Sequence, residues 1–173
     1  MVELLEFDRH ALLAGELWRL WSGHLVHYSA QHALIDFAVV LAAAVIVVQL
    51  SASPADGMRR LMLAVVLGAP FISLGMLLIA PQCLYYRGAS AIAAMLVLMA
   101  GGALWPRATR SMRAALLLMA ATLVAKIAAE AAGAVHGWSN LPLDVVVAWQ
   151  AHLLGVIAGA LTLPFRKPRL QLD

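Results

Sequence analysis

Five stretches of about 20 mostly apolar residues dominate this chain and limit what it can fold into. They cover roughly 33–52, 61–80, 88–105, 112–133 and 145–165. Each is long enough to cross a bilayer as a helix, and none alternates apolar and polar residues as membrane β-strands do. The sequence therefore predicts an all-α membrane protein, with five transmembrane helices in a single domain over 1–173.

The composition excludes the soluble classes of protein. Hydrophobic residues make up 64% of the chain and charged residues 12%, whereas soluble domains carry about 25% charged residues. The net charge of +3 is too small and scattered to predict nucleic-acid binding. The one cysteine, Cys83, excludes a disulfide framework and a cysteine-rich metal site. We expect no metal ion and no other cofactor.

Basic residues predict the orientation, because they concentrate in cytoplasmic loops. They follow the first, third and fifth apolar stretches, at Arg59, Arg60, Arg107, Arg110, Arg113, Arg166, Lys167 and Arg169. The opposite side carries Arg87 and then no lysine or arginine over 133–144. The odd-numbered helices are therefore expected to run inwards, which leaves the C-terminus in the cytoplasm.

Residues 1–32 contain no stretch long enough to span a membrane. Asp8 is placed to cap a short helix over 10–21, whose apolar side chains suit the membrane interface. The neighbouring Trp18 and Arg19 fit the headgroup level. We expect this outer segment to lie on the extracytoplasmic surface.

Several polar side chains lie within the apolar stretches, where such groups are costly. With the predicted orientation they all fall in the outer half of the membrane: His32, Asp36, Ser90, Lys126, Glu130 and His152. Polar groups from separate helices at one depth indicate a functional site.

Structural roles stay open for some of these groups. Lys126 and Glu130 are spaced four apart and can neutralise each other on one helix face. His24 and His27 lie in the outer segment, where simple solvent exposure is one interpretation. A metal site from His24, His27 and His32 is another, although no carboxylate spacing of a known type accompanies it.

Ser90 and His152 are the two polar residues whose surroundings most clearly indicate a contact between helices. His152 shares a helix face with Gly155 and Gly159, and small residues surround Ser90. Small faces let two membrane helices approach closely, which would bring the two side chains to similar depth. A serine beside a histidine is the minimum nucleophile–base pair.

Four motifs in order resemble the rhomboid family of intramembrane serine proteases, over residues 15–165. The family pattern is Trp-Arg, His-x-x-x-Asn, Gly-x-Ser-Gly and Ala-His-x-x-Gly-x-x-x-Gly. The corresponding residues here are Trp18-Arg19, His32-x-x-x-Asp36, Gly88-Ala89-Ser90-Ala91 and Ala151-His152-x-x-Gly155-x-x-x-Gly159.

The resemblance implies a role for each motif residue. Ser90 would attack a scissile carbonyl and His152 would act as general base. His32, Asp36 and the backbone N–H of Ser90 would hold the oxyanion, supported by Gly88. Trp18, Arg19, Gly155 and Gly159 would be structural. Tyr85 and Tyr86 are candidates for the rim of a water-filled depression.

The outer segment and Tyr85-Tyr86-Arg87-Gly88 look most like the rhombosortase branch. That small bacterial group is thought to process surface proteins with a C-terminal Gly-Gly sorting signal. The resemblance thus implies a membrane-anchored protein substrate, the bacterial inner membrane, and an active site that opens to the periplasm.

Three departures from the family pattern keep other functions open. The first helix of the six-helix core is missing, Asp36 replaces an asparagine, and Ala91 replaces a glycine. Burial favours the neutral form of Asp36, which still donates a hydrogen bond. One alternative is an inactive relative that binds client transmembrane helices. Another is a transporter or proton relay, although the inner halves of the helices are almost purely apolar.

Overall fold

The computed structural model describes residues 2–134 and 147–163 and shows a bundle of apolar helices. Four are long enough to cross a membrane: α3 (Ala30–Leu50), α4 (Pro54–Ile79), α5 (Ser90–Leu104, extended by the 3-10 turn η2, Trp105–Arg107) and α6 (Arg110–Ala131). A shorter apolar helix, α7 (Trp149–Leu161), follows. The predicted all-α membrane bundle is confirmed, while the ends of the stretch 145–165 lie outside the described residues.

Hydroxyl caps fix where three of the four long helices begin. The side chains of Ser29, Ser53 and Thr109 accept hydrogen bonds from backbone N–H groups in the first turns of α3, α4 and α6. Pro54 follows the second cap at a position that suits proline. α4 therefore begins well before the predicted residue 61, and Arg59 and Arg60 lie within the helix rather than in a loop.

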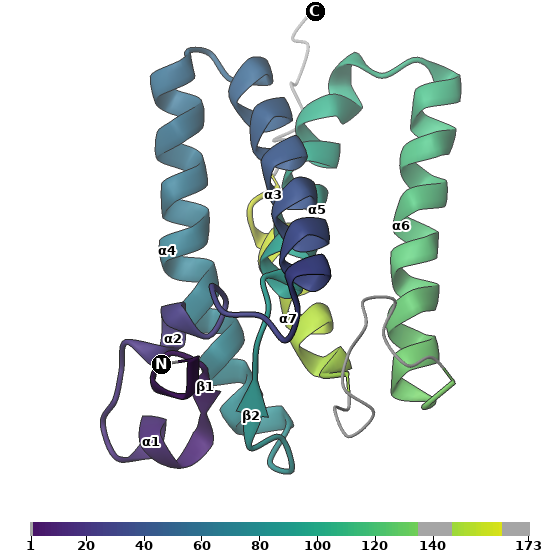
Figure 1. Ribbon diagram of the computed structural model, residues 1–173. Helices are drawn as coiled ribbons and strands as arrows, with labels where there is room; N and C mark the ends of the chain where they lie inside the picture. Colours follow the sequence, from purple (N-terminus) through teal and green to yellow (C-terminus); the bar gives the residue numbers. More distant parts are fainter. Residues whose placement is uncertain (1, 135–146, 164–173) are drawn as a thin grey trace, which may run out of the picture.

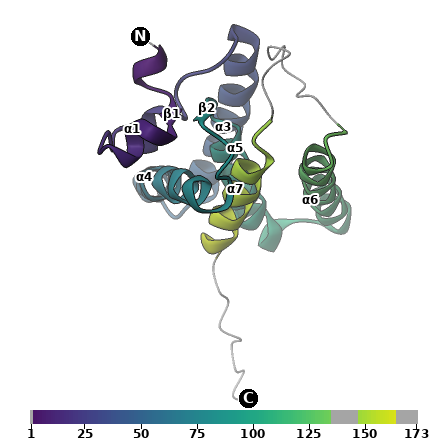
Figure 2. The same ribbon diagram turned by 90° about the horizontal axis from the view of Figure 1, so that it is seen from below.

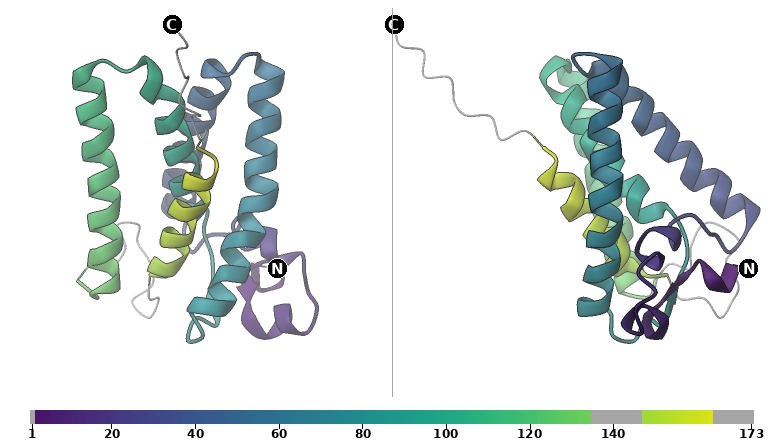
Figure 3. Two further views of the ribbon diagram at one scale, coloured as in Figure 1. Left: turned by 180° about the vertical axis from the view of Figure 1, so that it is seen from behind. Right: turned by 90° about the vertical axis from the view of Figure 1, so that its left-hand side faces the viewer.

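α5 lies at the centre of the bundle and packs mainly on α7 and α3, while α4 covers the remaining side. α6 stands apart from this group and meets it mostly at α7 (Figures 1 and 2). The turns after α3 and after η2 lie at one end, whereas the outer segment lies at the other (Figures 1 and 3). The bundle thus separates a basic end from the end that carries residues 2–29.

The contact between α5 and α7 brings two backbones together. A Cβ on Gly155 would collide with the carbonyl oxygen of Ala91, and one on Gly159 would lie 2.7 Å from the carbonyl oxygen of Met95. Only glycine fits at these two points. The small-residue string in the sequence marks this interface.

The outer segment is a compact cap made of short elements. Its 3-10 turn η1 (Val2–Leu4) leads into β1 (Phe7–Asp8), which pairs antiparallel with β2 (Tyr85–Tyr86), and α1 (Arg9–Leu13) and α2 (Arg19–Ser22) follow. Asp8 caps α1 as expected, but the predicted helix over 10–21 is wrong beyond Leu13. Gly15, at φ +104°, turns the chain away from helical geometry.

Arg19 holds this cap together from inside. Its guanidinium donates to the carbonyl oxygens of Glu3 and Glu6, both at 2.8 Å, and pairs with Glu16 at 2.7 Å. The residue is 3% exposed, whereas Trp18 is 53% exposed. Arg19 therefore does not face the lipid headgroups, because its Nε and Nη1 groups donate to a buried loop instead.

His24 attaches the cap to α4. Its Nε2 lies 3.1 Å from Ser73 Oγ and 3.3 Å from the carbonyl oxygen of Ala69. The side chain is buried, so solvation is the wrong interpretation for this histidine. Burial lowers its pKa from 6.5 to about 4.

The glycine contact gives a stability prediction. We expect Gly155→Ala to lower the unfolding free energy by about 1–3 kcal/mol, because the added methyl has no room against Ala91. Gly101→Ala is the matched control, since its Cβ would lie 3.9 Å from the nearest atom. Thermal unfolding in detergent measures both, and equal melting temperatures would contradict the close contact.

The buried His24 gives a pH prediction. Protonation of His24 favours the unfolded state. The contribution of the neutral His24 to the unfolding free energy is therefore fully present above pH 6.5 and is lost as the pH falls towards 4. The loss amounts to about 3 kcal/mol at most. His24→Gln should flatten this part of the curve of stability against pH, whereas His10→Gln, at an exposed histidine, should not. Parallel curves for wild type and His24→Gln would show that His24 is not buried in its neutral form.

Candidate active site

A tight turn places Ser90 at the first position of α5. Gly88 has φ +130°, which favours glycine, and a Cβ there would lie 2.9 Å from Cε1 of His32. The Gly88 N–H donates to the carbonyl oxygen of Gly23, and the Tyr86 hydroxyl donates to the Gly88 carbonyl oxygen at 2.9 Å. Burial raises the pKa of Tyr86, so the phenol stays a donor.

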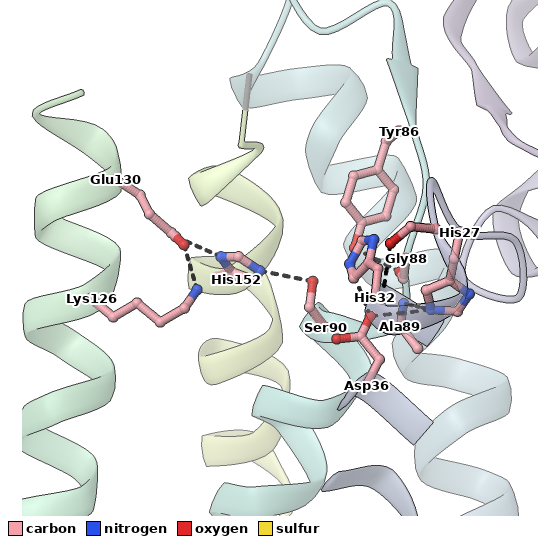
Figure 4. Close-up of polar contacts among 11 residues, drawn as sticks. His27, His32, Asp36, Tyr86, Gly88, Ala89, Ser90, Lys126, Glu130 and His152 are labelled. Carbon is pink, nitrogen blue, oxygen red and sulfur yellow. Dashed lines mark hydrogen bonds and ion pairs between the residues drawn. The ribbon is translucent and has the colours of Figure 1, made fainter. Parts of the chain in front are cut away.

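Ser90 and His152 meet across the contact between α5 and α7. The Oγ atom of Ser90 lies 2.8 Å from Nε2 of His152, and His152 is 6% exposed (Figure 4). A neutral imidazole at this distance accepts the hydroxyl proton. This is the geometry that activation of a serine nucleophile requires.

Glu130 adds a partner that the sequence did not reveal. The expected ion pair with Lys126 is present along α6. The same carboxylate also reaches α7, where its Oε2 lies 2.7 Å from Nδ1 of His152. The sequence indicated only that Glu130 and His152 lie at a similar depth in the membrane. Depth does not show which faces of α6 and α7 meet.

Asp36 lies between two histidines on the other side of Ser90. Its Oδ2 is 3.2 Å from Nε2 of His27 and 3.3 Å from Nε2 of His32. The side chain of His27 is 4% exposed, so solvent exposure is the wrong interpretation for it as well. Figure 4 shows these three side chains beside Gly88 and Ser90.

Whether His27 or Asp36 carries the proton between them depends on what else the His27 ring bonds to. Nε2 of His27 also lies 3.2 Å from the backbone N of Ala89. One ring nitrogen either donates or accepts, so accepting from the Ala89 N–H leaves no proton to give Asp36. In that arrangement a proton shared by His27 and Asp36 would have to come from the carboxyl group.

Stacked side chains cover His32 from the outer side. The ring of Tyr28 stacks on His32 with centroids 6.3 Å apart, and the Arg87 guanidinium lies 5.0 Å from the Tyr28 centroid. Arg87 is in turn paired with Glu6 at 2.6 Å, a hydrogen bond that raises the Arg87 pKa. The cap is thus connected to the site through one ion pair and two contacts of the Tyr28 ring.

Two open cavities flank the site. A groove of about 610 Å³ lies between α3, α5 and α6, and its lining includes Asp36, Ser90, Lys126 and His152. A pocket of about 600 Å³ lies at the outer end, lined by Glu6, Tyr28, Gln82, Cys83, Leu84, Tyr85, Arg87, Val147, Ala148, Trp149 and Gln150. Tyr85 therefore lies at this rim, whereas Tyr86 is buried below it.

The histidines of the outer segment do not form the alternative metal site. His24 bonds to Ser73 on α4, while His27 and His32 bond to Asp36. Within residues 2–134 and 147–163, no three His, Cys, Asp or Glu side chains are arranged to hold a metal ion.

Residues 14–168 match the family model of the rhomboid domain. The chain belongs to the rhomboid family. Comparisons with curated proteins and with solved structures gave no significant match. Rhomboid proteins are intramembrane serine proteases that act on membrane-embedded protein substrates within a bilayer, and this membership makes the chain an integral membrane protein.

The structure accommodates the family departure at Ala91. This residue is fully buried, and its backbone contacts Gly155 while Ser90 and His152 stay 2.8 Å apart. The added methyl group therefore does not separate the nucleophile from the histidine.

Proposed function

We propose that this rhomboid is an intramembrane serine endopeptidase in which Ser90 is the nucleophile and His152 the general base. The observation that carries the proposal is the 2.8 Å contact between Ser90 Oγ and His152 Nε2. Both side chains border the groove between α3, α5 and α6, so the pair is reachable from the membrane.

The proposed reaction has two halves. Ser90 Oγ attacks the scissile carbonyl carbon as its proton moves to His152, and the tetrahedral intermediate then expels the amine, which takes that proton. Water next attacks the acyl group on Ser90, giving its proton to His152, and the serine leaves with the proton returned. We place the source of this water at the outer end of the bundle, where the open pocket lies beside Tyr28 and Arg87.

The oxyanion forms beside the start of α5. The first N–H groups of a helix have no partner within it, so the N–H of Ser90 is suited to the negative oxygen. We assign His32 as a second donor and a protonated Asp36 as a third, whose single proton turns from Nε2 of His27 to the oxyanion. Gly88 lets the His32 ring approach this position, because a side chain there would displace it.

The proposed substrate is a protein anchored in the membrane. Its transmembrane segment lies in the groove along α6 and unwinds near its outer end, because a helical peptide bond hides its carbonyl group. We place the site on the periplasmic side of a bacterial inner membrane, with the C-terminus in the cytoplasm, in line with the basic residues. Assignment to the rhombosortase branch makes a C-terminal Gly-Gly sorting signal the preferred substrate, and glycine weakens a helix at the point of cleavage.

The proposed pair is tested by labelling with a fluorophosphonate. Ser90→Ala should abolish labelling and His152→Ala should reduce it by several orders of magnitude, while both proteins stay folded. Because the two residues act as a unit in peptide cleavage, the double variant should cleave no more slowly than either single one. Additive losses, or full labelling of Ser90→Ala, would contradict the proposed mechanism.

Asp36 is tested by the pH profile of labelling. If the neutral acid donates to the oxyanion, the rate falls as pH rises and the carboxyl ionises. Asp36→Asn keeps a donor at every pH and should remove this alkaline loss, whereas Asp36→Leu should lower the rate about 10²–10³-fold. An unchanged alkaline limb in Asp36→Asn, or complete inactivity, would assign the carboxylate a structural role with His27 and His32.

A further inference from the structure

We infer that Glu130 is a positioning residue for His152, so that a Ser90–His152–Glu130 triad carries the reaction. The inference rests on the proposed function of Ser90 and His152. It adds an acid that the family motifs do not include and that the chain supplies from α6.

The geometry is a continuous line of polar contacts across three helices. Ser90 Oγ contacts Nε2 of His152, and Nδ1 of the same ring lies 2.7 Å from Glu130 Oε2 (Figure 4). The side chain of Glu130 is 1% exposed. This buried carboxylate therefore faces Nδ1 of the imidazole, on the side of the ring opposite Ser90.

The carboxylate determines which ring nitrogen carries the proton. His152 accepts a proton at Nε2 only when its own proton is on Nδ1, and an acceptor at Nδ1 selects that tautomer. The same charge stabilises the imidazolium that forms when Ser90 gives up its proton. Glu130 thus prepares His152 before the reaction and stabilises it during the reaction.

Lys126 offsets the cost of burying the charge of Glu130. A lone carboxylate in a membrane protein interior is costly, and the ammonium of Lys126 pairs with the second oxygen, Oε1. The side chain of Lys126 is 37% exposed and borders the groove. Glu130 therefore has one oxygen for each partner.

The other polar and titratable groups near His152 already have partners. On α3, Asp36 also borders the groove but is held by His27 and His32. On α5, Ser90 is the polar neighbour, and on α6 the neighbours are Glu130 and Lys126. In the described part of the chain, Glu130 is the carboxylate that contacts the His152 ring.

The test compares Glu130→Gln, Glu130→Asp and wild type in their rate of fluorophosphonate labelling against pH. In that reaction the Ser90 oxygen bonds to phosphorus, fluoride leaves, and the serine proton moves to His152. An amide at residue 130 can donate to Nδ1 and favour the wrong tautomer. Glu130→Gln should therefore slow labelling by about 10²–10⁴-fold and move the acid limb down by about one pH unit.

Two further variants separate a positioning role from a structural one. Glu130→Asp keeps the charge and should retain part of the rate together with the wild-type acid limb. Asp56→Asn is the matched control, because Asp56 also pairs with a basic residue on its own helix but lies on α4, at the basic end of the bundle. It should label like wild type.

The outcomes distinguish the two proposals. Wild-type kinetics in Glu130→Gln, with labelling lost in Ser90→Ala, would overturn the triad and leave the proposed function standing. A smaller labelled fraction with an unchanged acid limb would assign Glu130 a role in stability only and overturn the inference. Undiminished labelling of Ser90→Ala would instead overturn the proposed function.

Discussion

The backbone contact between α5 and α7 is the constraint on which the rest of this protein depends. Apolar packing gives little direction to helices in a bilayer, because lipid tails are as apolar as leucine. Close approach at Gly155 and Gly159 fixes the spacing of the two helices directly. Ser90 and His152 lie at the outer ends of these helices, so their separation follows from main-chain contact rather than from adaptable side chains.

Several buried polar groups are tolerated in this bundle because they pair with one another. The guanidinium of Arg19 satisfies carbonyl oxygens of the cap, Asp36 is shared by two histidines, and Glu130 is shared by Lys126 and His152. Removing one member of such a set leaves a buried group without its partner, which costs more than the pair contributes. The polar contacts around Ser90 therefore stabilise the fold as well as arranging the groups of the site.

The sequence predicted the helices well because apolar stretches of this length have few alternatives in a bilayer. It also predicted that Ser90 and His152 lie at one depth, since the small residues beside them mark a close helix contact. It placed the start of α4 too late, because hydropathy does not register a Ser53 cap followed by Pro54. It missed the contact of Glu130 with His152, and the burial of His24 and His27, because depth along a helix says nothing about rotation or about how a cap folds back.

The separate position of α6 has a consequence for how the protein responds to its membrane. Helices accommodate a thicker or thinner bilayer by changing their tilt, and α6, about 33 Å long at 1.5 Å per residue, faces lipid over much of its surface. The α5–α7 pair, by contrast, is joined by backbone contact at Gly155 and Gly159. A change in the tilt of α6 would therefore alter the distance from Glu130 to His152 more than the distance from His152 to Ser90.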